Sequence, residues 1–191
     1  LMPMVSSAAA VGDDTTVRRS TRMSLWLIVI YGVMSLPIFY MSEGIFLALG
    51  QQAELAAYAA DYMCILAPAI IPALWANVMR SYLAAMEFTK VIMFITAGVA
   101  VLNIGFNHVL IFGKYGFPEL GIQGAAIASL LVNILTAVIT SIYAIVILPQ
   151  HTLFARFYRA DWPALVKVFK LGMPIGLSML AETGLFSAAS V

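Results

Sequence analysis

Apolar runs about as long as a bilayer is thick constrain this chain more than any other feature. A hydrocarbon core of about 30 Å needs about 20 apolar residues in a helix. Four stretches meet this requirement, at roughly 23–49, 55–79, 90–112 and 122–148. A fifth run starts near residue 171, and residues 1–11 read as the tail of an earlier helix. We therefore expect a segment of a longer protein whose helices cross a membrane.

The composition agrees with membrane helices. Hydrophobic residues make up 63% of the chain, charged residues only 10%, and the mean hydropathy is +0.99, whereas soluble domains carry about 25% charged residues. Backbone polar groups in lipid must be satisfied within their own segment, so the predicted fold is all-α, a polytopic membrane helix bundle. With a net charge of +1, the chain offers little to nucleic acid, which we exclude as a partner.

The basic residues predict the topology. Nine of the ten Lys and Arg residues fall in three connections, at 13–22, 80–90 and 149–170. The positive-inside rule places these connections in the cytoplasm. The last of them is predicted to be an amphipathic segment in the membrane interface, because it mixes basic residues with Phe154, Phe157, Tyr158 and Trp162.

Prolines and small residues predict where helices bend and where they pack closely. Pro37, Pro68 and Pro72 fall inside expected spans, where each removes a backbone donor and favours a kink. The sequence GIQGAAIAS at 121–129 has small residues at three- and four-residue spacing, which allows helix backbones to approach each other.

Glu182 is the charge that lies deepest in an expected span. It is about eleven residues beyond Leu171, roughly 16 Å along a helix and close to the midplane. A charge there costs at least ~2.5 kcal/mol and usually faces a cavity or a partner. Pro174 and Gly176 precede it and could break the helix, freeing carbonyls for a cation. We expect Glu182 to bind a cation; the alternative is a glutamate that only packs against a neighbouring helix.

Four more polar residues are candidates for a transport site. Asn103 and Asn107 are four residues apart and share one helical face, as a functional polar network or as hydrogen-bonding groups between helices. Tyr62 and Asn77 would lie about 60° apart around one helix and roughly 22 Å apart along it. They could line one long cleft but could not share one ion.

Some chemical classes are disfavoured by the sequence. No expected span contains Lys or Arg, and the sequence has neither a phosphate-binding loop nor the spacing of a metal site. We therefore expect no catalytic residues, no metal, no cofactor and no enzymatic activity. Carboxylate and amide groups among apolar, aromatic and Met residues suit a small cation or a cationic amphiphile.

The chain resembles the multidrug and toxic compound extrusion (MATE) transporters, in their NorM-like branch. The resemblance rests on several motifs in order, among them RRSTRMSLWL, RSYLAAME, NIGFNHVLIFGKYGFPELGIQGAAIAS and KLGMPIGLSMLAETGLF. It implies twelve helices in two six-helix lobes. Residues 1–148 would then be the N-lobe from the end of helix 2 through helix 6, 149–170 a cytoplasmic amphipathic linker, and 171–191 the start of helix 7 in the C-lobe.

The resemblance also implies roles for the candidate residues. Glu182 corresponds to the seventh-helix glutamate that binds the coupling cation in sodium-driven members. Asn103 and Asn107 resemble an N-lobe polar network whose second position is an aspartate in some members. Here that position is an asparagine, which does not titrate. Tyr62 and Asn77 resemble cleft-lining positions.

The implied function is the export of cationic amphiphilic drugs by alternating access, coupled to Na⁺ or H⁺. The protein would be a multi-pass protein of the bacterial inner (plasma) membrane, monomeric when full length, whose partners are small cationic organic substrates and membrane lipid. One alternative is a lipid-linked oligosaccharide flippase of the same superfamily, whose pyrophosphate cargo calls for cationic residues in the cavity. Others are a non-transporting membrane scaffold and an intramembrane enzyme, for which no catalytic dyad is found.

Overall fold

The fold is an all-helical bundle, as the sequence predicts. The computed structural model describes residues 1–114, 116, 118–154, 157 and 161–189. Arg156, Tyr158 and Arg159 of the expected linker lie outside the described residues. The described helices are α1 (Met2–Ala10), α2 (Asp14–Tyr40), α3 (Ser42–Ala48), α4 (Ala53–Leu66), α5 (Ile70–Ala85), α6 (Thr89–Phe112), α7 (Gly121–Ile147) and α8 (Trp162–Ala189).

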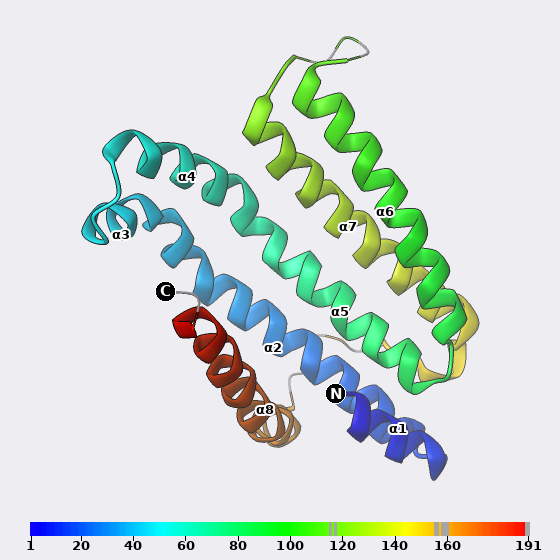
Figure 1. The fold of residues 1–191 in the computed structure, drawn as a ribbon. Coiled ribbons are helices and arrows are strands. Elements are labelled where there is room, and N and C mark those ends of the chain that lie inside the picture. Colours follow the sequence, from blue (N-terminus) through cyan, green and yellow to red (C-terminus); the bar gives the residue numbers. More distant parts are fainter. Residues whose placement is uncertain (115, 117, 155–156, 158–160, 190–191) are drawn as a thin grey trace.

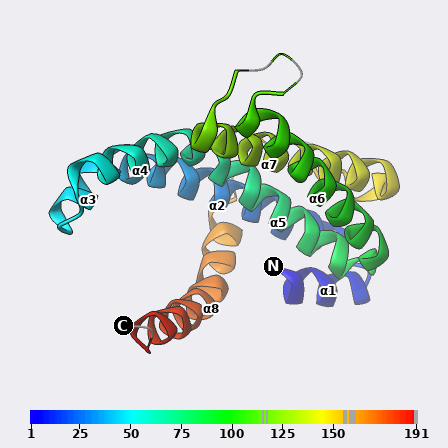
Figure 2. The same ribbon diagram turned by 45° about the horizontal axis from the view of Figure 1, so that its top comes forward.

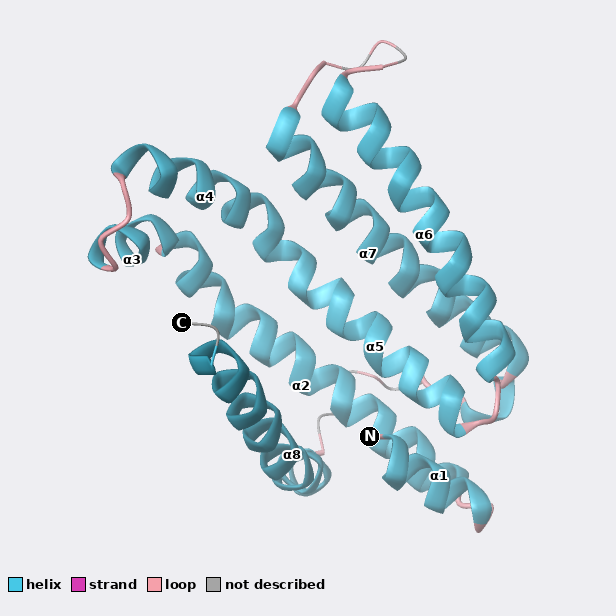
Figure 3. Ribbon diagram, in the orientation of Figure 1, coloured by secondary structure: helices cyan, strands magenta, loops and turns pink. Residues whose placement is uncertain are grey.

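The long helices lie side by side in one layer (Figure 1). Along this layer α2 packs on α4 and α5, these pack on α7, and α7 packs on α6. Helix α8 packs on α2 and then leaves the layer (Figure 2). The connections from α3 to α4 and from α5 to α6 lie at the ends of the layer (Figure 3), where the backbone need not be helical.

Five helical segments are long and apolar enough to cross a membrane, matching the expected number of spans. They are Asp14–Tyr40, Ala53–Ala85, Thr89–Phe112, Gly121–Ile147 and Trp162–Leu185. The second of these contains a 3₁₀ turn at Ala67–Ala69, between α4 and α5. This turn includes Pro68 and immediately precedes the first turn of α5, which contains Pro72, so the α-helix is interrupted where the prolines predicted a disturbance.

The first span differs from its expected range of 23–49. Helix α2 begins at Asp14 because Asp13 caps it, accepting a hydrogen bond from the Thr16 amide at 3.0 Å. It ends at Tyr40, one turn after Pro37, and α3 follows as a separate short helix. The basic residues of 13–22, which were expected in a connection, therefore lie in the first turns of α2.

Helix α8 also differs from expectation. It begins at Trp162, ahead of the predicted start near residue 171, and continues through Pro174 as one α-helix. The expected break at Pro174 and Gly176 is therefore wrong: the helix tolerates the missing proline donor, as membrane helices often do. The basic residues Lys167 and Lys170 consequently lie on α8 itself.

The largest buried cluster lies at the end of the layer where α2 begins and α5 and α7 end, which we call the charged end. Here the buried residues of α1, α2, α5 and α7 meet the segment after α7. Among the fully buried side chains are Val17, Leu25, Met79, Tyr82 and Leu83. The Arg and Lys residues of α2, α5 and α8 lie in the helix turns nearest this end, so helices carry cations that the sequence analysis had assigned to connections.

Gly124 allows α6 and α7 to pack closely against each other. A Cβ atom at this position would lie 2.4 Å from the backbone oxygen of Leu110 and 2.7 Å from its carbonyl carbon. Because the obstacle is backbone, it cannot rotate away as a side chain could. The close packing predicted from the small residues at 121–129 is confirmed at this residue.

We expect Gly124→Ala to destabilise the full-length protein by about 1–3 kcal/mol, because the added methyl group forces α6 and α7 apart. The measurement is thermal unfolding in detergent. Gly105→Ala on α6 is the matched control, since a Cβ there would meet nothing within 4 Å. Equal melting temperatures for the two variants would contradict the close-packing explanation.

Candidate functional site

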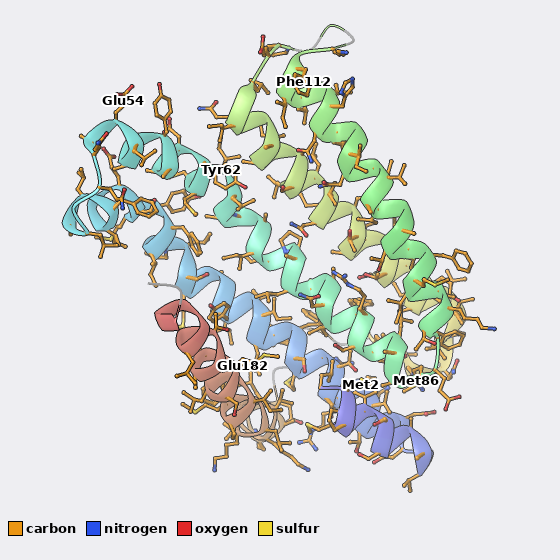
Figure 4. All side chains as sticks on the ribbon, in the orientation of Figure 1. Met2, Glu54, Tyr62, Met86, Phe112 and Glu182 are labelled. Atoms are coloured by element: carbon orange, nitrogen blue, oxygen red, sulfur yellow. The ribbon has the colours of Figure 1, made fainter. Side chains whose placement is uncertain are left out.

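Glu182 lies on the part of α8 that stands away from the layer. The side chains of α8 are exposed from Phe169 through Leu185, and Figure 4 shows Glu182 on this helix, apart from Tyr62. Within the described ranges, no other side chain gives Glu182 a hydrogen bond or an ion pair. Its neighbour Thr183 instead bonds within the helix, donating to the Met179 carbonyl at 2.8 Å. The carboxylate is thus available on a free helical face.

Asn103 and Asn107 are joined to each other. The Nδ2 atom of Asn107 donates to Oδ1 of Asn103 at 2.9 Å, and both side chains are half-buried on α6. The shared face predicted from their spacing is confirmed, but the bond runs within one helix. Each amide keeps further hydrogen-bonding capacity, so the pair can still bind an outside group.

Tyr62 and Asn77 lie on two different helices, α4 and α5, with the 3₁₀ turn between them. Tyr62 is half-buried and Asn77 is exposed. On α5, Asn77 follows Trp75 by two residues, or about 200° around the axis, so the two side chains leave opposite sides of the helix. The described structure therefore does not gather the predicted residues: Glu182 is on α8, the asparagine pair on α6, and Tyr62 and Asn77 on α4 and α5.

An apolar groove of about 740 Å³ lies between α5 and α7, on the Trp75 side. Pro72 and Ile142 are among its lining residues, and Phe154 is also part of the lining. The indole Nε1 of Trp75 donates to Ser141 Oγ at 3.0 Å, which satisfies both of these polar groups. A groove of this chemistry fits hydrocarbon and offers no charge to bind an ion.

The charged end contains a polar contact that the sequence analysis missed. His151 is 5% exposed, and its ring nitrogens face Tyr82 Oη at 2.5 Å and Asp14 Oδ1 at 3.2 Å. These three residues come from a 3₁₀ turn after α7, from α5 and from α2. A histidine in a short connection gives no periodic signal, so only the fold reveals this contact.

Two carboxylates at the charged end, outside the spans, are held ionised. The hydrogen bond from the Arg19 guanidinium lowers the pKa of the Asp161 carboxyl below its usual value. The Thr16 hydroxyl and amide lower the pKa of Asp13 in the same way. Because a lowered pKa favours the charged form, both contacts are present at neutral pH and are lost only as the pH falls through these lowered values.

Metal binding by clustered side chains is not seen in the part of the chain that the structure describes. No group of three or more His, Cys, Asp and Glu residues lies close enough there to hold an ion. Any cation held at Glu182 would need further ligands.

Comparisons with known proteins identify the family to which this chain is similar. The family model described as MatE matches residues 1–109, more than half of the chain. A protein of Rhizobium meliloti (strain 1021) described as "Probable multidrug resistance protein NorM" is 45% identical over 193 residues, covering 100% of this chain and 41% of the relative. A protein of Agrobacterium fabrum with the same description is 37% identical and covers 100% of this chain and 42% of the relative.

A solved structure gives the same fold. It is titled "Inward-facing conformation of a multidrug resistance MATE family transporter of the MOP superfamily", and it aligns with a TM-score of 0.80 at 20% identity. The alignment covers 94% of this chain and 40% of the solved chain. The chain thus spans about two fifths of the length of the curated relatives it matches.

We expect the polar and apolar faces of α5 and α7 to differ in their access to water. In the full-length protein with its other cysteines, including Cys64, replaced, Asn77→Cys should react with a charged methanethiosulfonate at least about tenfold faster than Ile142→Cys. The reason is that thiolate forms only where water reaches the sulfur, and polar residues in spans usually face water-filled cavities. Ile142 is also exposed in this chain but lines the apolar groove. Equal labelling rates would contradict this assignment of the two faces.

Proposed function

Since this chain belongs to the MatE family, we propose that the full-length protein is a multi-pass antiporter that exports cationic amphiphilic compounds in exchange for Na⁺ or H⁺. The observation that carries the proposal is similarity along the whole chain to relatives described as multidrug resistance proteins. The relatives are bacterial, which supports a location in the bacterial inner membrane. We further propose that the protein works as a monomer in contact with membrane lipid, without a bound cofactor and without nucleic acid.

Glu182 is the residue proposed to bind the coupling cation. It is the one acidic residue of α8, and its side chain lies on an exposed face where ligands from other helices could reach it. A carboxylate in lipid gains most from a cation, because its desolvation is otherwise uncompensated. The Asn103 and Asn107 amides are proposed as a separate polar site on α6, with Tyr62 and Asn77 lining the transport cleft.

The proposed mechanism needs competition between cation and drug. A ligand shifts a two-state equilibrium only if it binds the two states with different affinity. Cation binding at Glu182 would favour one orientation of the lobes and lower the affinity for a cationic drug in it. By linkage, the drug then lowers the affinity for the cation by the same factor.

The same observations give less support to two alternative functions. A flippase for pyrophosphate-linked cargo would need cations inside the cavity, and the Lys and Arg residues of the described α2, α5 and α8 lie near the charged end. A membrane scaffold would need no midplane carboxylate. An enzymatic role has no support in a family of transporters.

We expect Glu182→Gln to lower gradient-driven efflux of ethidium by about tenfold or more, because the neutral amide cannot exchange a proton or pair with Na⁺. The full-length protein is measured in vesicles with sodium and pH gradients imposed separately, which also identifies the coupling ion. Glu54→Gln, at the exposed start of α4, is the matched control and should transport normally. Unchanged efflux in the Glu182 variant would remove this residue from the mechanism, and dependence on neither gradient would overturn the antiporter proposal.

A further inference from the structure

The segment after α7 is fastened to the bundle. We call residues 148–154 together with Phe157 the strap. The strap follows α7, and its Phe154 and Phe157 reach α5 and α2. Leu153 is 4% exposed and belongs to the buried cluster at the charged end. The strap therefore contributes buried side chains to this cluster.

Two tryptophans hold the aromatic residues of the strap. Phe154 stacks on Trp75 of α5 with ring centroids 6.1 Å apart, and Phe157 stacks on Trp26 of α2 at 5.8 Å. Nε1 of Trp26 also donates to the Phe157 carbonyl at 2.9 Å. These two phenylalanines thus pack against helices of the bundle, and their interfacial position stays a prediction. Trp162, which is 65% exposed, remains suited to it.

His151 bridges the two helices that the strap contacts. A neutral imidazole has one donor and one acceptor. If Nε2 carries the proton, it donates to Asp14 of α2, and Nδ1 accepts from the Tyr82 hydroxyl of α5. This tautomer satisfies both buried ring nitrogens and the tyrosine hydroxyl in a single arrangement.

The backbone of the next residue, Thr152, is held in an unfavourable conformation by the contacts around it. Thr152 has φ of 41°, in the left-handed region that β-branched residues rarely adopt. Its hydroxyl accepts a hydrogen bond from Arg18 Nη1 at 3.0 Å. A strained backbone persists only where the surrounding contacts determine it, and here they are the contacts of His151, Thr152 and Leu153.

The same region fixes where α8 begins. Asp161, just before α8, pairs with Arg19 of α2, and Leu165 in the second turn is buried. From Phe169 onward the described side chains of α8 are exposed. In this chain, α8 is thus attached to the bundle at its start.

We propose that His151 is a positioning residue that clips the strap onto α2 and α5, so that the strap and the start of α8 move with these helices as one body. The strap would then be a fixed part of the N-terminal bundle, where the sequence predicts only a linker. The proposal concerns the movement of the chain and does not depend on which compound or ion is transported.

Hydrogen exchange of the full-length protein in nanodiscs, read by mass spectrometry, tests this proposal. His151→Phe keeps an aromatic ring but cannot bridge, so the amides of residues 150–154 should exchange about tenfold faster or more. His151→Gln can donate to Asp14 and accept from Tyr82, so exchange there should stay close to that of the wild type. His108→Phe, at an exposed histidine of α6, is the matched control and should change nothing in the strap.

Comparing His151→Phe with His151→Gln distinguishes the hydrogen bonds of the His151 side chain from the packing of its ring. Two outcomes would show that His151 does not act as a bridge, and either would overturn the proposal. In the first, the strap amides of His151→Phe exchange as slowly as those of the wild type. In the second, His151→Gln accelerates their exchange as much as His151→Phe does. Should His151→Phe not fold, Tyr82→Phe removes one of the two bonds and should give a smaller acceleration confined to the strap; no acceleration would overturn the proposal. Because exchange is read without substrate or gradient, its outcome is independent of the efflux experiment.

Discussion

A helix in lipid must satisfy its backbone hydrogen bonds internally, and the rest of this structure depends on that requirement. It places turns between neighbouring helices at the ends of the layer, as in the connections from α3 to α4 and from α5 to α6 (Figure 3). Between the ends, helices recognise one another by shape, as Gly124 of α7 does against the backbone of Leu110, and by isolated hydrogen bonds such as that from Trp75 to Ser141. At the charged end several polar contacts lie close together, and they join α2, α5 and the strap.

Much of the fold could be predicted from local sequence. The number of spans, the interruption of the second span near Pro68 and Pro72 and the close packing at Gly124 all follow from residue chemistry within one or two helical turns. The family resemblance is confirmed as well. Helix ends were harder to predict, because a cap such as Asp13 extends a helix into a basic stretch that hydropathy alone assigns to a connection.

The candidate site could be predicted only in part. Spacing correctly placed Asn103 and Asn107 on one face, since both lie on one helix. The contacts of His151 could not be predicted, because its partners are 69 and 137 residues away in the sequence. The inward packing of Phe154 and Phe157 was missed for the same reason: an aromatic residue beside basic ones has the same sequence pattern in an interface as in a core. The ligands of Glu182 remain a prediction, because they are expected on helices outside this chain.

The long sequence separation of the strap contacts has a consequence for biosynthesis. At a translation rate of about 5–20 residues per second, Asp14 leaves the ribosome on the order of 10 s before His151 is made. During that time the polar ends of α2 and α5 have no strap to bind and must be solvated by water or lipid headgroups. The strap can therefore pack in place only after all the helices that it contacts have been synthesised.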